Sequence, residues 1–269
     1  KDNTAKELDK QNLPEDQLKL AKQIIGDLMD VLEKTIDNKK SDGGMVLLLD
    51  PEAVTVVVGS VIADGAKLES TLKLLAAEVQ KDSPELSKMF KLDAETHDGV
   101  RFHVLNIPVP ERELVPMVGE TLEVVVAIGD DRVYLAGGRN AAATLKKVMD
   151  GSKATPEGDA PPLSISISAT PVAKFIAAVA DEDQVKMMAG TIAGMLQATG
   201  GKDHVTITST SISNGVRMRV TIEEGILKVI GTVSQMMGPG GPGGPGGPGG
   251  LEEPESLEIT EEVEEEKSL

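Results

Sequence analysis

The chain has 269 residues, a formal net charge of -17 at pH 7, no Cys or Trp, three Phe and one Tyr. Without cysteine, thiol catalysis and thiolate metal sites are excluded. Nucleic acids are unfavourable partners, because they are bound by positive charge and aromatic stacking faces. The same charge disfavours anionic membrane surfaces. No run approaches the length of about 18 apolar residues that predicts a transmembrane segment.

The first 80 residues predict helix, strand, strand and helix. We expect residues 1–14 to be a polar disordered lead, with Asn12 to Glu15 resembling a capping box. Apolar residues at helical spacing predict an amphipathic helix over 15–37. Strands are expected at 45–50 and 53–62, and the second is β-branched and apolar on both faces, as is typical of a central strand. Asp64 is expected to cap the helix that follows.

A hairpin is predicted at Asp98-Gly99, a pair that suits a two-residue type I′ turn. His97 then pairs with Val100, and His103 falls on the opposite face of the sheet, so the two histidines do not chelate one metal. This register also places charged residues opposite apolar ones, which indicates a slipped register or an irregular strand. Further strands are expected at 122–128 and 132–136, followed by a helix from Asn140 to Met149 and a loop at 151–162.

The second half predicts a similar mixture of strands and helices. Residues 163–168 alternate strictly between apolar and polar, as in a strand with one solvated face. Helices are expected to begin at Thr170-Pro171 and at Asp181, and a last helix spans 226–237. Asn214-Gly215 predicts a hairpin between two long strands, of which His204 begins the first. Residues 238–250 read as a Gly-Pro linker, and 251–269 as an acidic disordered tail.

Motifs that carry chemistry are largely missing from the sequence. Ser60 follows Gly59 but lacks the rest of a nucleophile motif. One G-x-G-x-x-G match lies in the Gly-Pro linker, where no strand and helix flank it. We therefore predict no catalytic, metal or cofactor-binding residues. Four methionines are candidates for lining an apolar ligand site, with core filling as the alternative: Met187, Met188, Met195 and Met236.

Three stretches resemble segments of uncharacterised exported bacterial proteins of domain-of-unknown-function families, including families abundant in planctomycete-like bacteria. They are VTVVVGSVIADGAKLESTLKLLAAEV, VVVAIGDDRVYLAGGRNAAATLKKV and GVRMRVTIEEGILKVIG. The resemblance implies an α+β fold and a periplasmic or extracellular location, and it supplies no catalytic residues. Members are expected to begin with a signal peptide and an earlier strand, so the start of this chain fits a truncated or processed form.

The prediction is an α+β domain over 15–237, with helices on one face of a twisted, mostly antiparallel sheet. Two similar strand–helix halves with a break near 151–162 are an open possibility. For function, we predict a non-enzymatic exported protein with a structural or partner-binding role in the cell envelope. The alternatives are a carrier of an apolar, lipid-like ligand and a hydrolase that uses paired carboxylates. The hydrolase would need a carboxyl group with a strongly raised pKa.

Overall fold

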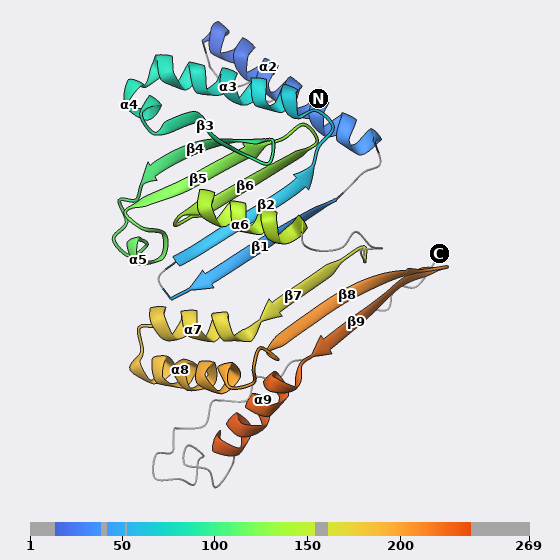
Figure 1. Ribbon diagram of the computed structural model, residues 1–269. Coiled ribbons are helices and arrows are strands. Elements are labelled where there is room, and N and C mark those ends of the chain that lie inside the picture. The colour runs from blue at the N-terminus through green and yellow to red at the C-terminus, as the bar shows by residue number, and fades with distance from the viewer. Residues whose placement is uncertain (1–13, 39–41, 52, 154–160, 238–269) are drawn as a thin grey trace, which may run out of the picture. The chain divides into compact units, whose positions relative to one another are not determined.

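The computed structural model describes residues 14–38, 42–51, 53–153 and 161–237 (Figure 1). The chain divides into two compact units, one formed by 1–160 with 171–190 and one by 161–170 with 191–269. The predicted linker at 238–250 and acidic tail at 251–269 lie outside the described residues, as does the predicted lead apart from Pro14. Along the described ranges no helix is long and apolar enough to cross a membrane.

The first unit is built on a six-stranded antiparallel sheet of order β1-β2-β6-β5-β4-β3. Its strands are β1 (Gly43–Asp50), β2 (Ala53–Val61), β3 (Phe90–His97), β4 (Val100–Pro108), β5 (Thr121–Ile128) and β6 (Arg132–Gly138). Strand β2 pairs on both of its edges, which confirms the prediction of a central strand at 53–62. The predicted strands at 45–50, 122–128 and 132–136 correspond to β1, β5 and β6.

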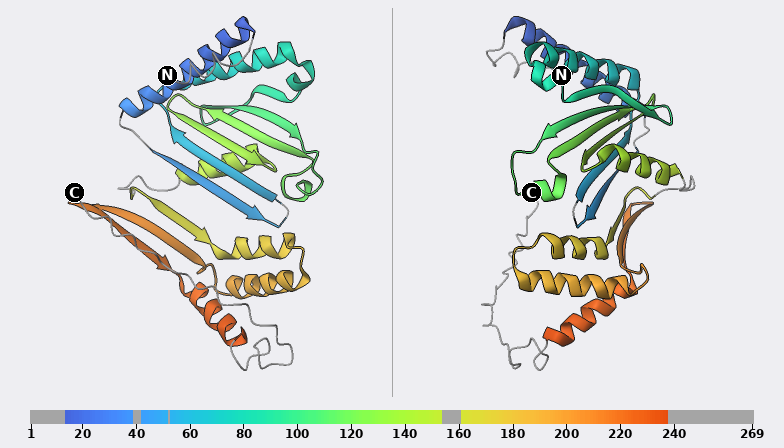
Figure 2. Two further views of the ribbon diagram at one scale, coloured as in Figure 1. Left: turned by 180° about the vertical axis from the view of Figure 1, so that it is seen from behind. Right: turned by 60° about the vertical axis from the view of Figure 1, so that its left-hand side comes forward.

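Helices α2 (Glu15–Asp37) and α3 (Gly65–Asp82) run side by side in all views (Figures 1 and 2). The α2 range matches the prediction, but the capping-box prediction is wrong, because α2 begins after Pro14 without a side-chain cap. The Asp64 cap of α3 is confirmed, since its Oδ1 accepts the Lys67 N–H at 3.0 Å. The other helices of residues 14–153 are α4 (Pro84–Ser87), α5 (Val115–Val118) and α6 (Ala141–Lys153).

Helices cover both faces of the six-stranded sheet, whereas the sequence led us to expect one covered face. Phe102 of β4 belongs to the buried core formed with Leu145 and Met149 of α6. His103, the next residue along β4, faces Glu69 of α3. Because neighbouring residues on a strand point to opposite faces, α3 and α6 lie on opposite sides. Accordingly, α6 lies in front of the strands in Figure 1 and behind them in the left panel of Figure 2.

The hairpin of β3 and β4 turns at Asp98-Gly99, as predicted, and both residues have positive φ (51° and 77°). His97 pairs with Val100, which confirms that part of the predicted register. The pairing shifts between Lys91 and Glu95, and Asp93 within this bulge has a φ of 50°. The irregular strand expected from the mismatch of charged and apolar residues is therefore present.

The three-stranded sheet has the order β7-β8-β9, with β7 (Ser164–Ser168), β8 (His204–Ile212) and β9 (Gly215–Ile222). The remaining helices are α7 (Ala169–Val179), α8 (Asp183–Gln197) and α9 (Glu224–Met237). The hairpin at Asn214-Gly215 is confirmed, and the register aligns Ile165, Ile207 and Val220 on one face. All strand pairings among the described residues are antiparallel, so the α+β class is as predicted.

Candidate functional site

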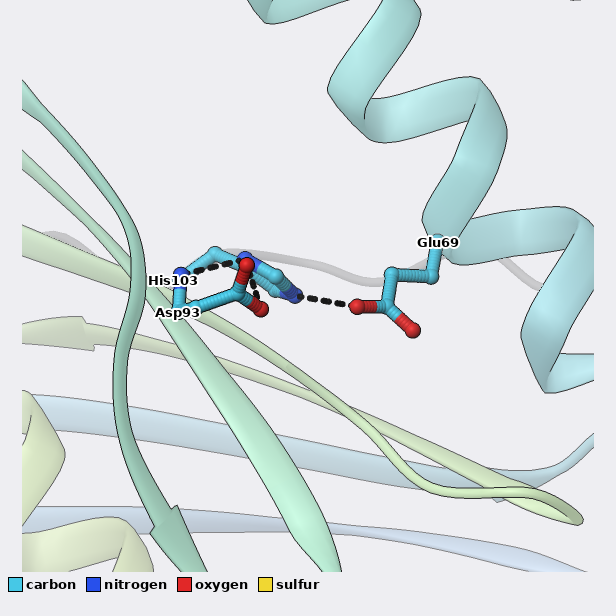
Figure 3. A group of neighbouring side chains, drawn as sticks. All are labelled: Glu69, Asp93 and His103. Carbon is cyan, nitrogen blue, oxygen red and sulfur yellow. Dashed lines mark hydrogen bonds and ion pairs between the residues drawn. The ribbon is translucent and has the colours of Figure 1, made fainter.

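A buried polar cluster lies between α3 and β4 in the first unit (Figure 3). Glu69 of α3 and His103 of β4 are 7% and 4% exposed. The Glu69 carboxylate forms ion pairs with Arg101 and with Lys73, the latter at 2.8 Å. Lys73 also lies 2.8 Å from Asp93 Oδ2 in the β3 bulge. The cluster thus contains two carboxylates, two cations and one imidazole.

Charge pairing keeps the buried Glu69 ionised. Burial by itself would raise the pKa of Glu69, but hydrogen bonds from Lys73 and Arg101 outweigh it, and the pKa is lowered. The pKa of Asp93 is lowered as well, chiefly through its hydrogen bond with Lys73. Both carboxylates are therefore negative at neutral pH, and their charge is balanced by the two cations.

His103 supports the backbone of the bulge. Its Nδ1 accepts the backbone N–H of Asp93 at 3.1 Å, so the neutral ring must carry its proton on Nε2. That Nε2 is buried without a hydrogen-bond partner, and Glu69 Oε1 lies 3.9 Å away. Burial lowers the pKa of His103, and the nearby carboxylates of Asp93 and Glu69 oppose this shift. Where the bulge interrupts the pairing of β3 with β4, the imidazole of His103 takes the place of the backbone carbonyl that would otherwise accept the Asp93 N–H.

This geometry does not suit a metal ion. Glu69 approaches Nε2 of His103, whereas Asp93 approaches Nδ1 on the other side of the ring, each at 3.9 Å. Lys73 already bridges the two carboxylates. A ligating nitrogen must offer a lone pair, but Nε2 carries the proton and Nδ1 accepts the Asp93 N–H. The cluster is best described as an ion-pair network that fastens α3 to the sheet.

A second cluster joins the β3–β4 turn to the end of α6. His97 Nε2 lies 2.8 Å from Asp150 Oδ1 and 3.3 Å from Asp98 Oδ2. Lys153 pairs with the same Asp98 oxygen. His97 lies on the α6 side of the sheet and His103 on the α3 side, which confirms the prediction that the two are on opposite faces.

A third cluster lies at one end of the three-stranded sheet. Asp203, which is 2% exposed, accepts hydrogen bonds from the Ser168 hydroxyl at 2.7 Å and the Thr170 N–H at 2.8 Å. His204 Nδ1 lies 3.2 Å from Asp203 and 3.4 Å from Glu223. In a catalytic triad the histidine lies between the serine and the carboxylate. Here Ser168 donates directly to Asp203, so Ser168, His204 and Asp203 do not form a triad.

An open cavity of about 670 Å³ lies beside β1, β2, β6 and α6. Its wall includes Val57, Met149 and Tyr134, together with the cationic residues Arg132 and Lys153. The Tyr134 ring lies over Gly59, since a Cβ placed there would be 2.8 Å from Tyr134 Cδ1. The volume falls in the range of small-molecule sites. Both cations are already paired, Lys153 with Asp98 and Arg132 with Asp131, so the cavity suits an apolar ligand better than an anionic one.

The four methionines of the predicted ligand site have different surroundings. Met187 and Met188 in α8 are 69% and 48% exposed. Met195 lines a shallow pocket of about 230 Å³ with Val229 and other residues of α9. Met236 lies in α9, but its side chain is not among those described. A shared apolar ligand site for these residues stays a prediction.

Every resolved pKa shift of a carboxyl group in the described residues is a decrease. Wherever a shift is resolved, the pKa is lowered, which applies to Asp64, Glu69, Asp93, Asp98, Asp203 and Glu224. A general acid would need a raised pKa to hold its proton near neutral pH. These groups therefore do not supply the feature that the hydrolase alternative requires.

A patch of exposed apolar side chains covers the β1 edge of the six-stranded sheet on its α3 side. We call Met45, Leu47, Val58 and Leu135 the β1 patch; they are 71%, 53%, 38% and 49% exposed. The register aligns Met45 with Val58 and Val58 with Leu135, and Leu47 lies two residues from Met45 on the same face. The patch is therefore contiguous across three strands. The sequence shows the apolar run but not that it occupies a sheet edge.

Comparison of the chain with protein-family models, curated proteins and solved structures finds no match.

Proposed function

We propose that the chain is a non-enzymatic protein that binds a partner protein through β1 and the β1 patch. The observation that carries this proposal is an apolar strand at the edge of a sheet with its side chains exposed. Residues 43–49 contain no charged side chain. Soluble proteins usually protect such edges with charges, proline or bulges, because unprotected edges pair with other strands. Exposed contiguous apolar surface is typical of interaction sites.

The exposed edge of β1 suits a partner that adds an extended segment to the sheet as a further strand. Among the described residues no strand pairs with the outer edge of β1, so its backbone groups are available to an extended segment. Alternating apolar side chains of that segment would pack against Met45 and Leu47. A net charge of -17 disfavours association of two copies and favours a neutral or basic partner. A role in the cell envelope is part of this proposal and is supported by the resemblance to exported bacterial proteins.

Site-specific photo-crosslinking tests the proposal. The full chain, carrying a photoreactive residue at Leu47, is expressed in cells that produce the protein and irradiated. A matched chain carries the same residue at Ile36 of α2, which is 68% exposed and outside the β1 patch. We expect one defined crosslinked protein at Leu47 that is absent at Ile36 and lost in the Met45→Lys variant. Identical crosslinks at both positions, or none at Leu47, would contradict the proposal.

A second candidate function is transport of an apolar, lipid-like ligand, and the 670 Å³ cavity favours it. Its position near Tyr134 and Arg132 differs from the methionine site predicted from sequence. Native mass spectrometry of the full chain should then show an extra mass that disappears on denaturation. The Gly59→Val variant should lose that mass, since its side chain would displace Tyr134. A purified wild-type chain without added mass would argue against a carrier.

A further inference from the structure

Three potential metal ligands converge at one end of the three-stranded sheet. His204 is the first residue of β8, Asp203 directly precedes it, and Glu223 directly follows β9. His204 pairs with Ser168 at the end of β7, and the Glu223 N–H donates to the His204 carbonyl at 3.0 Å. The antiparallel register therefore fixes all three backbones close together. In sequence, Glu223 is separated from His204 by almost the whole β8–β9 hairpin.

The spacing of the donor atoms suits a small divalent cation. His204 Nδ1 lies 3.2 Å from Asp203 Oδ1 and 3.4 Å from Glu223 Oε2, and all three donor atoms lie within 4.8 Å of one another. Ligands held tetrahedrally about Zn²⁺ at about 2.0–2.2 Å are separated by roughly 3.4 Å. One nitrogen of His204 faces both carboxylates, unlike His103, whose two nitrogens face different carboxylates.

Asp203 is fixed in the orientation that a ligand needs. Its side chain is buried, and Oδ2 is held by the Ser168 hydroxyl and the Thr170 N–H, which leaves Oδ1 facing His204. Outer hydrogen bonds of this kind orient carboxylate ligands in metal sites.

Charge distinguishes this cluster from the other two. Among the described residues, no ion pair joins a Lys or Arg to Asp203 or Glu223; Lys202 pairs with Glu224 at 2.8 Å and acts on Glu223 only through space. In the α3 cluster the carboxylates are already paired with Lys73 and Arg101, and at His97 the Asp98 carboxylate is paired with Lys153. A divalent cation would supply the positive charge that Asp203 and Glu223 do not receive from an ion pair.

We propose that Asp203 Oδ1, His204 Nδ1 and Glu223 Oε2 bind a divalent transition-metal ion, with Zn²⁺ as the best match. Two carboxylates and one imidazole suit borderline cations better than Ca²⁺ or Mg²⁺, which take oxygen ligands. Three protein ligands leave at least one coordination position for water or a partner carboxylate. The ion would join the start of β8 to the turn between β9 and α9.

Calorimetric titration of the metal-free full chain with ZnCl₂ tests the site. We expect one equivalent of Zn²⁺ in the wild type, at least tenfold weaker binding in Glu223→Gln and no binding at this site in His204→Ala. The matched control is Asp150→Asn, which removes a carboxylate from the His97 cluster and should bind Zn²⁺ as the wild type does. No binding to the wild type, or loss of binding in Asp150→Asn rather than His204→Ala, would overturn the proposal.

Melting temperature separates loss of the site from loss of the fold. A ligand that binds only the folded state raises the melting temperature, and the rise grows with the ratio of ligand concentration to Kd. With chelator present, His204→Ala should melt cooperatively, and added Zn²⁺ should raise the melting temperature of the wild type and Asp150→Asn alone. A Zn²⁺-dependent rise of equal size in a folded His204→Ala variant would also overturn the proposal.

Discussion

At the scale of single residues, His103 shows how a buried titratable group serves the backbone. Its Nδ1 receives the Asp93 N–H where the β3–β4 ladder is interrupted, so the neutral ring is the form that the fold requires. Burial keeps the pKa of His103 below the ordinary value of about 6.5. The sequence predicted an irregular strand at this point of the hairpin. It did not indicate that His103 supports the bulge, because Asp93 lies ten positions away in the chain.

Protonation of His103 should destabilise the fold. Between the lowered folded pKa and the unfolded value of about 6.5, the unfolded chain binds more protons, so the free energy of unfolding falls as pH decreases. In His103→Asn an amide oxygen can accept the Asp93 N–H without titrating. Denaturant unfolding from about pH 7.5 to about pH 5.5 should show a smaller decrease for the variant than for the wild type. Equal pH dependence would contradict this role.

Two neighbouring glycines of β6 make a matched pair. Gly138 has a φ of 141°, and a Cβ there would lie 2.2 Å from the Val54 carbonyl oxygen; at Gly137 a Cβ meets nothing within 4 Å. We expect Gly138→Ala to lower the free energy of unfolding by about 2–5 kcal/mol. Gly137→Ala should stay within about 0.5 kcal/mol of the wild type. Urea titration of both variants measures the difference, and equal losses would contradict it.

At the scale of elements, periodicity predicted most helices and strands but not which faces they cover. The spacing in 15–37 and the alternation in 163–168 depend on local geometry alone, and α2 and β7 follow them. Placement of α3 and α6 on opposite faces depends on the β2-β6-β5-β4 order, which no local pattern encodes. Capping shows the same limit. The sequence predicted a helix that begins at Thr170-Pro171, whereas α7 begins at Ala169 and the Thr170 N–H is bound by Asp203, 33 residues away.

Helix α6 should be held on its sheet mainly by Leu145. This side chain is fully buried with Phe102 and Val125, and the Lys146 ammonium lies 5.9 Å from the Phe102 ring. We expect Leu145→Ala to lower the free energy of unfolding by about 2–5 kcal/mol through lost burial and a residual cavity. Lys147→Ala, at an exposed position of the same helix, should change it by less than about 0.5 kcal/mol. Similar losses of unfolding free energy in Leu145→Ala and Lys147→Ala would show that the buried face of α6 does not anchor the helix.

At the scale of the whole molecule, charge and exposed apolar surface act in opposite directions. The net charge of -17 favours solubility, while the β1 patch and the apolar face of the three-stranded sheet remain accessible. Residues 251–269 carry nine Glu and one Lys, so much of the negative charge lies outside the described fold. The acidic residues 251–269 add to the negative charge that favours solubility.

Removal of 238–269 should therefore affect solubility rather than stability. We expect the chain that ends at Met237 to melt within about 2 °C of the full chain, because the removed residues are mostly charged, polar or Gly-Pro-rich and are too poor in apolar side chains to add a hydrophobic core. Differential scanning calorimetry measures this, and light scattering should show more self-association in the shortened chain. A large decrease in melting temperature would place part of the core beyond Met237.

The sequence by itself determined the α+β class, the hairpin turns at Asp98-Gly99 and Asn214-Gly215, and the extents of most elements. These depend on interactions between residues near one another in the chain. Only the tertiary structure decided that β1 is an exposed edge, that α3 and α6 cover opposite faces, and that Glu223 meets Asp203 and His204. Such features arise from strand order and register, which bring together residues separated by long stretches of chain.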